Sequence, residues 1–470
     1  MGRIVIDPIT RISGFLETKV KVDKNIITDA ETSGLLFRGF EKMLKSRAPL
    51  DAIFFTERIC GICSTAHAVA SASALENALN IEVSLNDSYV RDLIHGFEFI
   101  QNHIRHFYNF TVPSYVKMPK INPLYSNQYS DYRMPERIND KISEHYLKSL
   151  EFGRLAHEGS AVLSGKAPHT HGIFAGGVTV NLDSYKIVKI KSIISKLKDF
   201  ISTFMIDDMY TISSYYKDYF KMGASYGNFM SYGLFYKYAD PEIRYVEPGV
   251  LIGGKKYNFD SSKITENILH TWYASDKDTQ RPQEENEETV DINKEGGYSF
   301  IKSPNYDGYS MEVGPLARLK LSGEYKGGNS CMDRNIARVL ETKKIIGIMQ
   351  GFADRIEPTQ NKQRVYNIPN EAFGEGLIDT TRGALGHFIK IENKLIKYYN
   401  IITPTVWNIG PRDSSKRLGT GEKALIGTEI KNINEPIEIG RIIRSFDPCV
   451  SCATHVVSDR AEPFDIEVLV

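Results

Sequence analysis

Apolar residues recur along this chain with two different spacings. Strict alternation over Ile4 to Ile6 and Phe15 to Val22, a polar turn at residues 23–25 and a further segment from Ile26 to Thr28 are typical of strands. We therefore predict a small antiparallel sheet within residues 1–35. After this sheet the apolar residues recur every third and fourth position instead, which is the period of a helix with one buried face.

The clearest helical pattern runs from Asn86 to Phe110. Its apolar residues follow one another at intervals of three and four: Val90, Leu93, Phe97, Ile100, Ile104 and Phe107. The same spacing predicts helices from about Lys141 to Leu163, from Leu182 towards Tyr219, and from Asp333 to Arg355. The body of the protein is thus expected to be mainly helical.

Residues 222–330 differ in composition from the rest of the chain. They are rich in Gly, Tyr and Pro, contain short strand-like segments, and include an acidic polar stretch at 275–297 that predicts a surface loop. With no internal repeat or flexible linker in the sequence, we predict one domain that is mainly α with α+β insertions. Its parts are the sheet 1–35, a helical part 36–221, an α+β insertion 222–330, a helical and C-terminal metal-binding part 331–455, and a tail 456–470.

Charge and hydropathy exclude two classes of partner. Lys plus Arg and Asp plus Glu both number 58 among 470 residues, so no net charge attracts nucleic acid or an anionic membrane. No apolar run approaches the roughly 20 residues that cross a bilayer, which predicts a chain without a transmembrane segment. The opening MGRIVIDPIT does not have the pattern of a signal peptide.

Four of the five cysteines form two CxxC pairs, each followed within four residues by a histidine. The residues are Cys60, Cys63 and His67 in RICGICSTAH, and Cys449, Cys452 and His455 in DPCVSCATH. Thiolates select soft or borderline metals such as Zn, Ni and Cu(I), so the two pairs are interpreted as halves of one metal site. A structural zinc site is the alternative, but its ligands usually lie within a few tens of residues, and here the pairs are 386 positions apart.

The two cysteine motifs together resemble the paired signature of nickel–iron hydrogenase large subunits. Further blocks resemble that family in the family's order: DPITRISG, LLFRGFE, SPNYDGYSMEVGPLARL, TTRGALGHF and PTVWNIGPRD. The resemblance covers essentially the whole chain. It implies the multihelical hydrogenase large-subunit fold, with a central helix bundle and a small N-terminal antiparallel sheet, and an enzyme that oxidises H2 reversibly and heterolytically.

The resemblance also implies the cofactor. In the family four thiolates hold nickel, and two of them bridge to an iron that carries carbon monoxide and cyanide. By motif position Cys60 and Cys449 are terminal ligands, Cys63 and Cys452 are bridging ligands, and Cys449 is the first base for the proton. A magnesium ion, or an iron ion, occupies a third site, which maps to Glu41, the carbonyl of Ile401 and His455.

Residues around the metals follow from the same motif positions. Arg382 and Thr405 match the family's hydrogen-bonding partners of cyanide, Arg382 also faces the open coordination position, and His67 is expected to donate to a cysteine sulfur. The roles assigned to Arg382, Cys449 and Asp447 are catalytic.

The chain departs from the family pattern at three positions. Ser13 replaces the glutamate that is the usual first proton relay, Asn102 replaces an aspartate, and Thr381 replaces a proline. Serine can pass a proton but cannot hold one near pH 7, so the usual proton route is in question. Glu17, Asp447 and ordered water are the candidate substitutes.

Partners follow from the number of cysteines. Iron–sulfur clusters need about four cysteines each, and only Cys331 lies outside the two pairs, so a small subunit with such clusters must carry the electrons. The resemblance adds nickel-insertion proteins and a maturation protease that removes residues 456–470 after His455. It favours export together with the small subunit, with the cytoplasm as the alternative. Two other functions remain open, a hydrogen-sensing or low-turnover subunit and a protein whose four paired cysteines hold a structural zinc ion.

Overall fold

An antiparallel sheet opens the chain, as the alternating pattern predicts. The structure, a computed structural model, describes residues 2–119, 129–286, 289–361 and 364–453, and for residues 452 and 453 only the backbone. Strands β1 (Gly2–Ile6), β2 (Leu16–Asp23) and β3 (Ile26–Gly34) pair in that order. Strand β3 runs six residues beyond the predicted end at Thr28 because its polar residues pair across the fold. Thr32, for example, donates its N–H to Glu422 at 3.1 Å.

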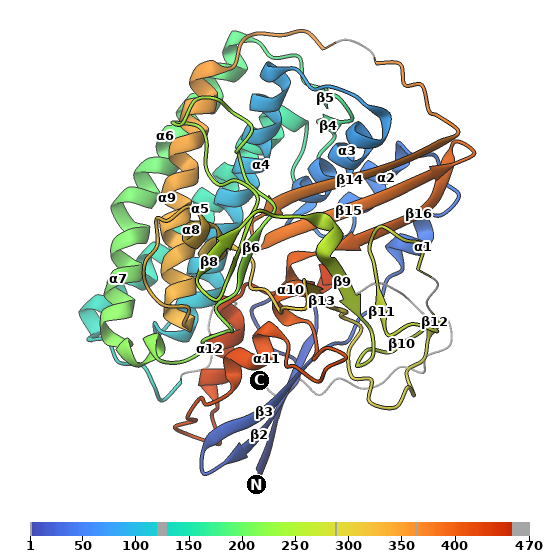
Figure 1. Cartoon of the computed structure of the whole chain (residues 1–470). Coiled ribbons are helices and arrows are strands. Elements are labelled where there is room, and N and C mark those ends of the chain that lie inside the picture. Colours follow the sequence, from blue (N-terminus) through green and yellow to red (C-terminus); the bar gives the residue numbers. More distant parts are fainter. Residues whose placement is uncertain (1, 120–128, 287–288, 362–363, 454–470) are drawn as a thin grey trace.

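Five long helices pack against one another, and in Figure 1 they lie above this sheet. They are α4 (Leu85–Arg105), α5 (Glu136–Ser164), α6 (Ser184–Phe200), α7 (Ile206–Tyr215) and α9 (Cys331–Arg355). The predicted helices at 86–110, 141–163 and 333–355 are confirmed. The predicted helix at 182–219 is divided, because a π-helical turn at Ile201–Met205 separates α6 from α7.

Helix α4 has the buried face that its apolar spacing predicts. Its N-cap Ser84 accepts a hydrogen bond from the N–H of Asp87, and Leu93, Phe97 and Ile100 are fully buried. The helix continues into a π-helical turn at His106–Thr111. Such π-helical turns are rare overall, but those that occur are often found at functional sites.

A three-stranded antiparallel sheet in the C-terminal part corrects the prediction that residues 331–455 are helical apart from the metal-binding end. Its strands are β14 (Glu371–Thr380), β15 (Gly383–Glu392) and β16 (Leu395–Ile402). Strand β14 lies directly on helix α3 (Ser64–Leu79), and a Cβ atom at Gly376 would lie 2.0 Å from the carbonyl oxygen of Ala70. The glycines that permit this approach also interrupt the alternation that would have indicated a strand.

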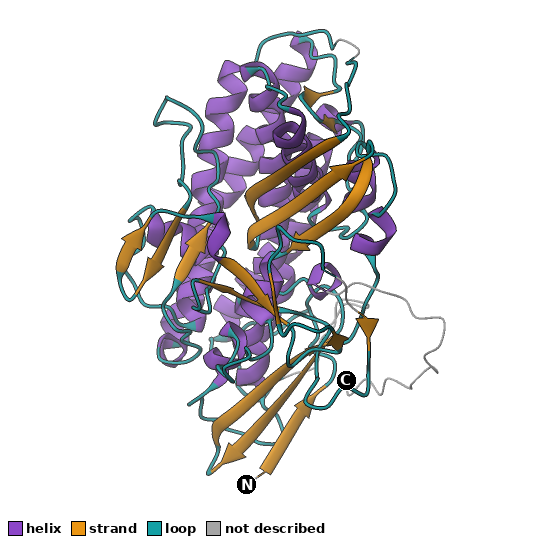
Figure 2. Cartoon of the chain, turned by 45° about the vertical axis from the view of Figure 1, so that its right-hand side comes forward, coloured by secondary structure: helices purple, strands orange, loops and turns teal. Residues whose placement is uncertain are grey.

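The insertion at 222–330 contains the short strands that the sequence predicts. Its sheets are β6 (Phe229–Ser231), β7 (Gly249–Ile252) and β8 (Lys255–Tyr257); β11 (Thr279–Gln280), β9 (Ile264–Asn267) and β13 (Ser303–Tyr306); and β10 (Tyr273–Ala274) with β12 (Thr289–Val290). Helix α8 (Pro315–Leu321) follows. Figure 2 shows these strands as separate small sheets around the helices. The predicted acidic loop at 275–297 contributes the two short strands β11 and β12.

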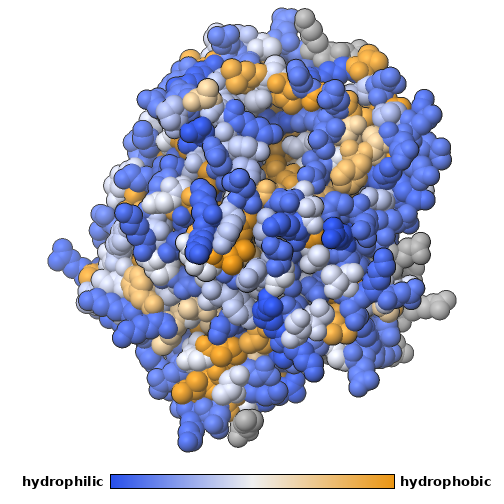
Figure 3. Space-filling model, viewed as in Figure 1, coloured by the Kyte–Doolittle hydropathy of each residue, from blue (hydrophilic) through white to orange (hydrophobic). Residues whose placement is uncertain are grey.

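Short elements complete the chain and carry the motifs. They are α1 (Phe40–Leu44), α2 (Asp51–Glu57), the pair β4 (Ile173–Phe174) and β5 (Gly177–Val178), α10 (Pro404–Ile409), α11 (Thr420–Leu425), α12 (Ile437–Ser445) and α13 (Val450–Ala453). Hydrophilic residues cover most of the face in Figure 3, with hydrophobic residues interspersed. Within the described residues, no helix combines the length and apolar character that crossing a membrane requires.

Candidate metal centre

The two cysteine motifs meet in a buried cluster. The Sγ atoms of Cys60, Cys63 and Cys449 all lie within 4.8 Å of one another, and those of Cys60 and Cys449 are 3.4 Å apart. The side chain of Cys452 and all of His455 lie outside the described residues. Cys331 lies elsewhere and donates its S–H to the carbonyl of Arg441 at 3.3 Å. The structure therefore brings together three of the four predicted thiolates and separates them from the fifth cysteine.

The first motif is held between two helices. Helix α2 ends at Glu57, and Cys63 is the N-cap of helix α3. In the loop between them the Sγ of Cys60 accepts hydrogen bonds from the N–H groups of Ile62 and Cys63, each at 3.2 Å. Such bonds to sulfur stabilise the thiolate form, which is the form that binds metal.

The second motif is held by the beginning of the chain. The N–H of Ser13 donates to the carbonyl of Pro448 at 3.2 Å, and the carbonyl of Ser13 accepts from the N–H of Val450 at 2.7 Å, so Ser13 brackets Cys449. Arg38 then joins the two motifs, since its guanidinium donates to the carbonyls of Ile59 and Ser451.

Gly14 is expected to be irreplaceable at this contact. It has φ +88°, and a Cβ atom there would lie 2.5 Å from the backbone nitrogen of Ser451. Gly14→Ala should therefore displace the second motif and lower the nickel content of the purified protein several-fold. Gly253→Ala is the matched control: Gly253 also has positive φ, +56°, but nothing lies within 4 Å, so only about 1 kcal/mol of backbone strain is expected. Equal nickel contents in the two variants would contradict the close contact.

A buried network of three polar side chains lies beside the cysteines. Nη2 of Arg382 donates to Oδ1 of Asn102 at 2.9 Å and lies 3.0 Å from Oδ1 of Asp447. Nε of Arg382 donates to the main-chain oxygen of Asp447 at 2.8 Å, and Nδ2 of Asn102 donates to Oδ2 of Asp447 at 2.8 Å. The three residues come from the β14–β15 turn, helix α4 and the segment after α12, so partners from two other elements hold the guanidinium of Arg382.

The charges in this network are strongly coupled. Burial alone would lower the pKa of Arg382, but Asp447 and the three cysteines outweigh it and hold the pKa well above its ordinary value. Burial alone would raise the pKa of Asp447, but the neighbouring cations, Arg382 foremost, keep it below its ordinary value. Asp447 therefore stays ionised at neutral pH, which suits it to holding Arg382 and makes it a poor proton store.

The two threonines predicted near the metals each contact a residue of the site. Oγ1 of Thr405 accepts the N–H of Cys449 at 2.9 Å, which leaves the hydroxyl proton to donate elsewhere. Thr381 is fully buried, and its Oγ1 lies 3.4 Å from Nη1 of Arg382. Both threonines therefore lie beside the cysteine cluster. A hydrogen bond from Thr405 to cyanide stays a prediction.

His67 contacts a second histidine. Its Nδ1 lies 3.0 Å from Nε2 of His387, whose Nδ1 lies 2.8 Å from the hydroxyl of Tyr399. Burial lowers the pKa of His67 to about 4, so the ring is neutral at pH 7. The charge of Cys449 has the opposite effect and raises this pKa. The ring is therefore close to the cluster, and its predicted hydrogen bond to a cysteine sulfur stays a prediction.

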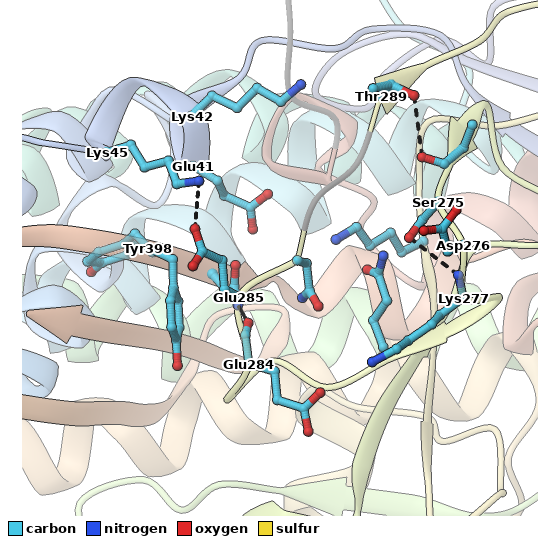
Figure 4. Close-up of a pocket in the computed structure, with 16 residues that line it drawn as sticks. Glu41, Lys42, Lys45, Ser275, Asp276, Lys277, Glu284, Glu285, Thr289 and Tyr398 are labelled. Carbon is cyan, nitrogen blue, oxygen red and sulfur yellow. Dashed lines mark hydrogen bonds and ion pairs between the residues drawn. The ribbon is translucent and has the colours of Figure 1, made fainter.

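Two of the three candidate ligand residues of the hard third metal lie together. Oε1 of Glu41 accepts the N–H of Ile401 at 2.8 Å, although the two residues are far apart in sequence. Glu41 lines a pocket of about 920 Å³, beside the ion pair between Lys45 and Glu285 at 2.7 Å (Figure 4). Glu17, the other carboxylate considered for proton transfer, pairs instead with Lys19.

Comparison with known proteins decides the family. A sequence model described as nickel-dependent hydrogenase matches residues 38–128, 111–328 and 320–455. The chain belongs to the nickel-dependent hydrogenase family. It is 33% identical to the periplasmic [NiFeSe] hydrogenase large subunit of Desulfomicrobium baculatum, over 97% of this chain and 95% of that protein. It is 30% identical to the hydrogenase-2 large chain of Escherichia coli K12, over 99% and 100%.

Solved structures agree with this hydrogenase assignment. The nickel–iron–selenium hydrogenase of Desulfovibrio vulgaris Hildenborough matches with a TM-score of 0.91 and 34% identity, over 97% of this chain and 100% of that chain. The corresponding enzyme of Dm. baculatum matches with a TM-score of 0.92 and 33% identity. The prediction of a nickel–iron hydrogenase large subunit is confirmed. A structural zinc site is not needed to explain the paired cysteines.

The donor set of this hydrogenase fits the family's metals. Three buried sulfurs within 4.8 Å of one another are what a soft transition metal requires, and a guanidinium balances the negative charge that they bring. The family and its solved structures thus support a nickel–iron centre at this cluster.

Several residues of the hydrogenase site were missed by sequence reasoning. Arg338, whose Nε lies 4.0 Å from Oδ2 of Asp447, and the bridging Arg38 were not identified. Glu98 and Arg105 were also missed, although they flank Asn102 on α4 at a spacing of four and three residues. Polar residues at helical spacing within a buried helix are the signal that would have found them.

Proposed function

We propose that this chain is the catalytic subunit of a hydrogenase that splits H2 into two protons and two electrons, and also catalyses the reverse reaction. The observation that carries the proposal is the convergence of Cys60, Cys63 and Cys449 beside the buried cation Arg382. A structural zinc site does not need a buried guanidinium beside its thiolates. Family membership supplies the reaction class.

The cysteines would hold the metals, with Cys452 as the fourth ligand. The nickel–iron centre, when bound, supplies the Lewis acidity that polarises H2. Arg382 and Thr405 would donate to the cyanide ligands of iron, since a guanidinium and a hydroxyl satisfy acceptors that would be costly to leave unpaired in a dry pocket. The short contact between Thr405 and Cys449 supports this placement.

The chain's own residues then handle the first proton. Cys449 is the proposed base, and it accepts the proton at Sγ. Arg382 is the fixed cation that stabilises the developing negative charge, and Asp447 with Asn102 holds it in position. Because the network is buried and already hydrogen-bonded, it needs no rearrangement when the reaction occurs.

A third metal, magnesium or iron, is proposed at Glu41 and the carbonyl of Ile401. The carboxylate and this backbone segment are in hydrogen-bond contact, and hard cations prefer such oxygen ligands. The third predicted ligand, His455, lies outside the described residues.

Electron transfer requires a partner. Beyond the two CxxC pairs the chain has only Cys331, which is buried and bonded to the carbonyl of Arg441, so the chain cannot ligate an iron–sulfur cluster of its own. We propose a small subunit with iron–sulfur clusters as the acceptor. The printed names of the relatives, large subunit and large chain, support such a partner.

Removal of residues 456–470 is proposed to complete maturation, with nickel-insertion proteins acting before a protease. The family match ends at residue 455, which supports His455 as the last residue of the mature protein. We expect the intact mass of nickel-loaded, active protein to correspond to a chain ending at His455, while nickel-free precursor keeps the tail. Active protein with residues 456–470 still attached would refute this step.

Metal analysis combined with a turnover assay tests the function. The purified complex is expected to contain nickel and iron and to reduce an artificial electron acceptor with H2. Zinc in place of both metals would end the proposal. Nickel and iron with only trace turnover would favour a hydrogen sensor instead.

A further inference from the structure

Helix α4 presents a polar stripe to the cysteine cluster. Glu98, Asn102 and Arg105 are spaced four and three residues apart and therefore share one face of the helix. Asn102 is bonded to Arg382 and Asp447, and the charge of Arg105 interacts with Cys60 and Glu98. Glu98 thus lies one helical turn from the network beside the metals.

Glu98 is placed at the start of helix α3. Its Oε2 accepts the N–H of Thr65 at 2.7 Å and its Oε1 accepts the N–H of Ala66 at 3.0 Å. These are first-turn donors of the helix whose N-cap is the predicted ligand Cys63. The Glu98 side chain is buried.

A second buried carboxylate lies next along this path. Glu57 ends helix α2, and its side chain is 1% exposed. Its Oε2 accepts from Nη1 of Arg58 at 2.9 Å, while its Oε1 has no hydrogen-bond partner among the described residues. Glu57 and Glu98 flank the same motif: Glu57 precedes Cys60 by three residues, and Glu98 binds the N–H groups of residues 65 and 66, just after Cys63. The charge of Glu98 also raises the pKa of Glu57.

Both carboxyl groups have the protonation behaviour of a relay. Burial raises the pKa of Glu98 to about 7, against the lowering effect of the Thr65 and Ala66 N–H groups and of Arg382. Burial raises the pKa of Glu57 to about 8, against the lowering effect of Arg58. A group whose pKa lies near ambient pH both accepts and releases a proton readily, whereas Ser13 cannot hold one.

Beyond Glu57 lie polar residues near the surface, which we call the Arg58 rim. Arg58 has a side chain 43% exposed, Lys166 is exposed, and Nδ1 of His169 lies 3.1 Å from the carbonyl of Glu57. The charged groups that face the two carboxylates are thus Arg382 and Arg105 at the inner end, and Arg58 and Lys166 at the outer end.

We propose that Glu98 and Glu57 carry protons from the cysteine cluster towards the Arg58 rim, in the role that the family resemblance assigns to a carboxylate at position 13. The inference rests on the proposed hydrogenase function. The S–H bond of a protonated cysteine breaks as an O–H bond forms on Glu98, and that O–H bond breaks as one forms on Glu57. Glu57 then releases the proton to water. Bridging water is a normal link in such a relay, and the two electrons leave separately through the small subunit.

Exchange of H2 with deuterated water, measured on the purified two-subunit complex, tests the relay. Glu98→Gln is expected to lower the exchange rate by about 10²-fold or more, while nickel content and the cyanide and carbonyl infrared bands stay unchanged. Glu375→Gln is the matched control, a partly buried carboxyl on β14 whose pKa is also raised by burial, and it should leave exchange unchanged. Exchange in Glu98→Gln within twofold of the unmodified complex would overturn the proposal.

Infrared pH titration gives a readout that does not depend on turnover. The difference spectrum between unmodified protein and Glu98→Gln should contain a carboxylic-acid C=O band that disappears on raising the pH through about 7. The difference band should also be present in nickel-free precursor. Identical pH-dependent carboxylic-acid bands in the two proteins would count against the relay.

Two further variants separate proton transfer from structural damage. Ser13→Glu in the Glu98→Gln background should restore much of the lost exchange, because it returns a titratable group beside Cys449; no recovery would count against a relay role. If Glu98→Gln fails to assemble, Glu57→Gln decides, and full exchange in that variant overturns the proposal. Absence of cyanide and carbonyl bands in the unmodified complex would instead defeat the proposed function itself.

Discussion

Cys449→Ser is expected to abolish hydrogen turnover and to reduce bound nickel to background. Three contacts place Cys449 in the site. Its Sγ lies 3.4 Å from that of Cys60, its N–H donates to Oγ1 of Thr405, and its two sequence neighbours form backbone hydrogen bonds with Ser13. Serine has nearly the same shape, so the fold should survive. Its hydroxyl is a hard donor that stays protonated near neutral pH, so it can neither hold a soft metal nor accept the proton.

Cys331→Ser is the control for this substitution. Cys331 is equally buried, but its thiol donates to a backbone carbonyl, a bond that a serine hydroxyl can also make. Nickel content and turnover should therefore be nearly unchanged. Full hydrogen uptake by Cys449→Ser would refute the assignment of the cluster.

Arg382→Lys is expected to lower turnover by about 10²–10³-fold while nickel content stays near normal. Lysine keeps the positive charge and so still balances Asp447. It loses the planar fork, however, and cannot donate at once to the side chain of Asn102 and to the main chain of Asp447, as the guanidinium does. The cation would then be mispositioned relative to the reacting hydrogen.

Arg412→Lys is the matched control. Arg412 is also a partly buried arginine bonded to an aspartate, with Nη2 3.0 Å from Oδ1 of Asp29, but it belongs to the contact with the N-terminal sheet. This variant should retain turnover. Activity of Arg382→Lys within a few-fold of the unmodified enzyme would show that Arg382 only stabilises the fold.

Local patterns predicted the helices and the first sheet well, because their burial follows a regular period. The sheet β14–β16 was not predicted because the sequence of its first strand is adapted to helix α3. Gly374 and Gly376 are needed where β14 contacts α3, and nothing in residues 371–380 indicates that contact. The long strand β3 was likewise underestimated because polar residues such as Thr32 are paired by residues about 390 positions away.

The candidate site likewise contains residues that the sequence predicts and residues that only the structure reveals. The cysteines were predictable because four thiolates in two spaced pairs have few chemical uses, and Arg382 because its motif resembles the family's. Glu98 and Glu57 were missed, since a single glutamate in a helix is normally a solvated surface residue. Only Glu98 has a signal in the sequence, its helical spacing from Asn102 and Arg105. The fold shows that both are buried beside the first cysteine motif, and that burial raises the pKa of each towards neutrality.

Infrared spectroscopy of the purified complex tests the central claim most directly. Cyanide and carbon monoxide bound to iron absorb in a region where proteins themselves have no bands. We predict bands of both ligands in the unmodified complex and their loss in Cys449→Ser. A nickel-containing or zinc-containing protein without any such bands would contradict the assignment of the cysteine cluster as a nickel–iron hydrogenase centre.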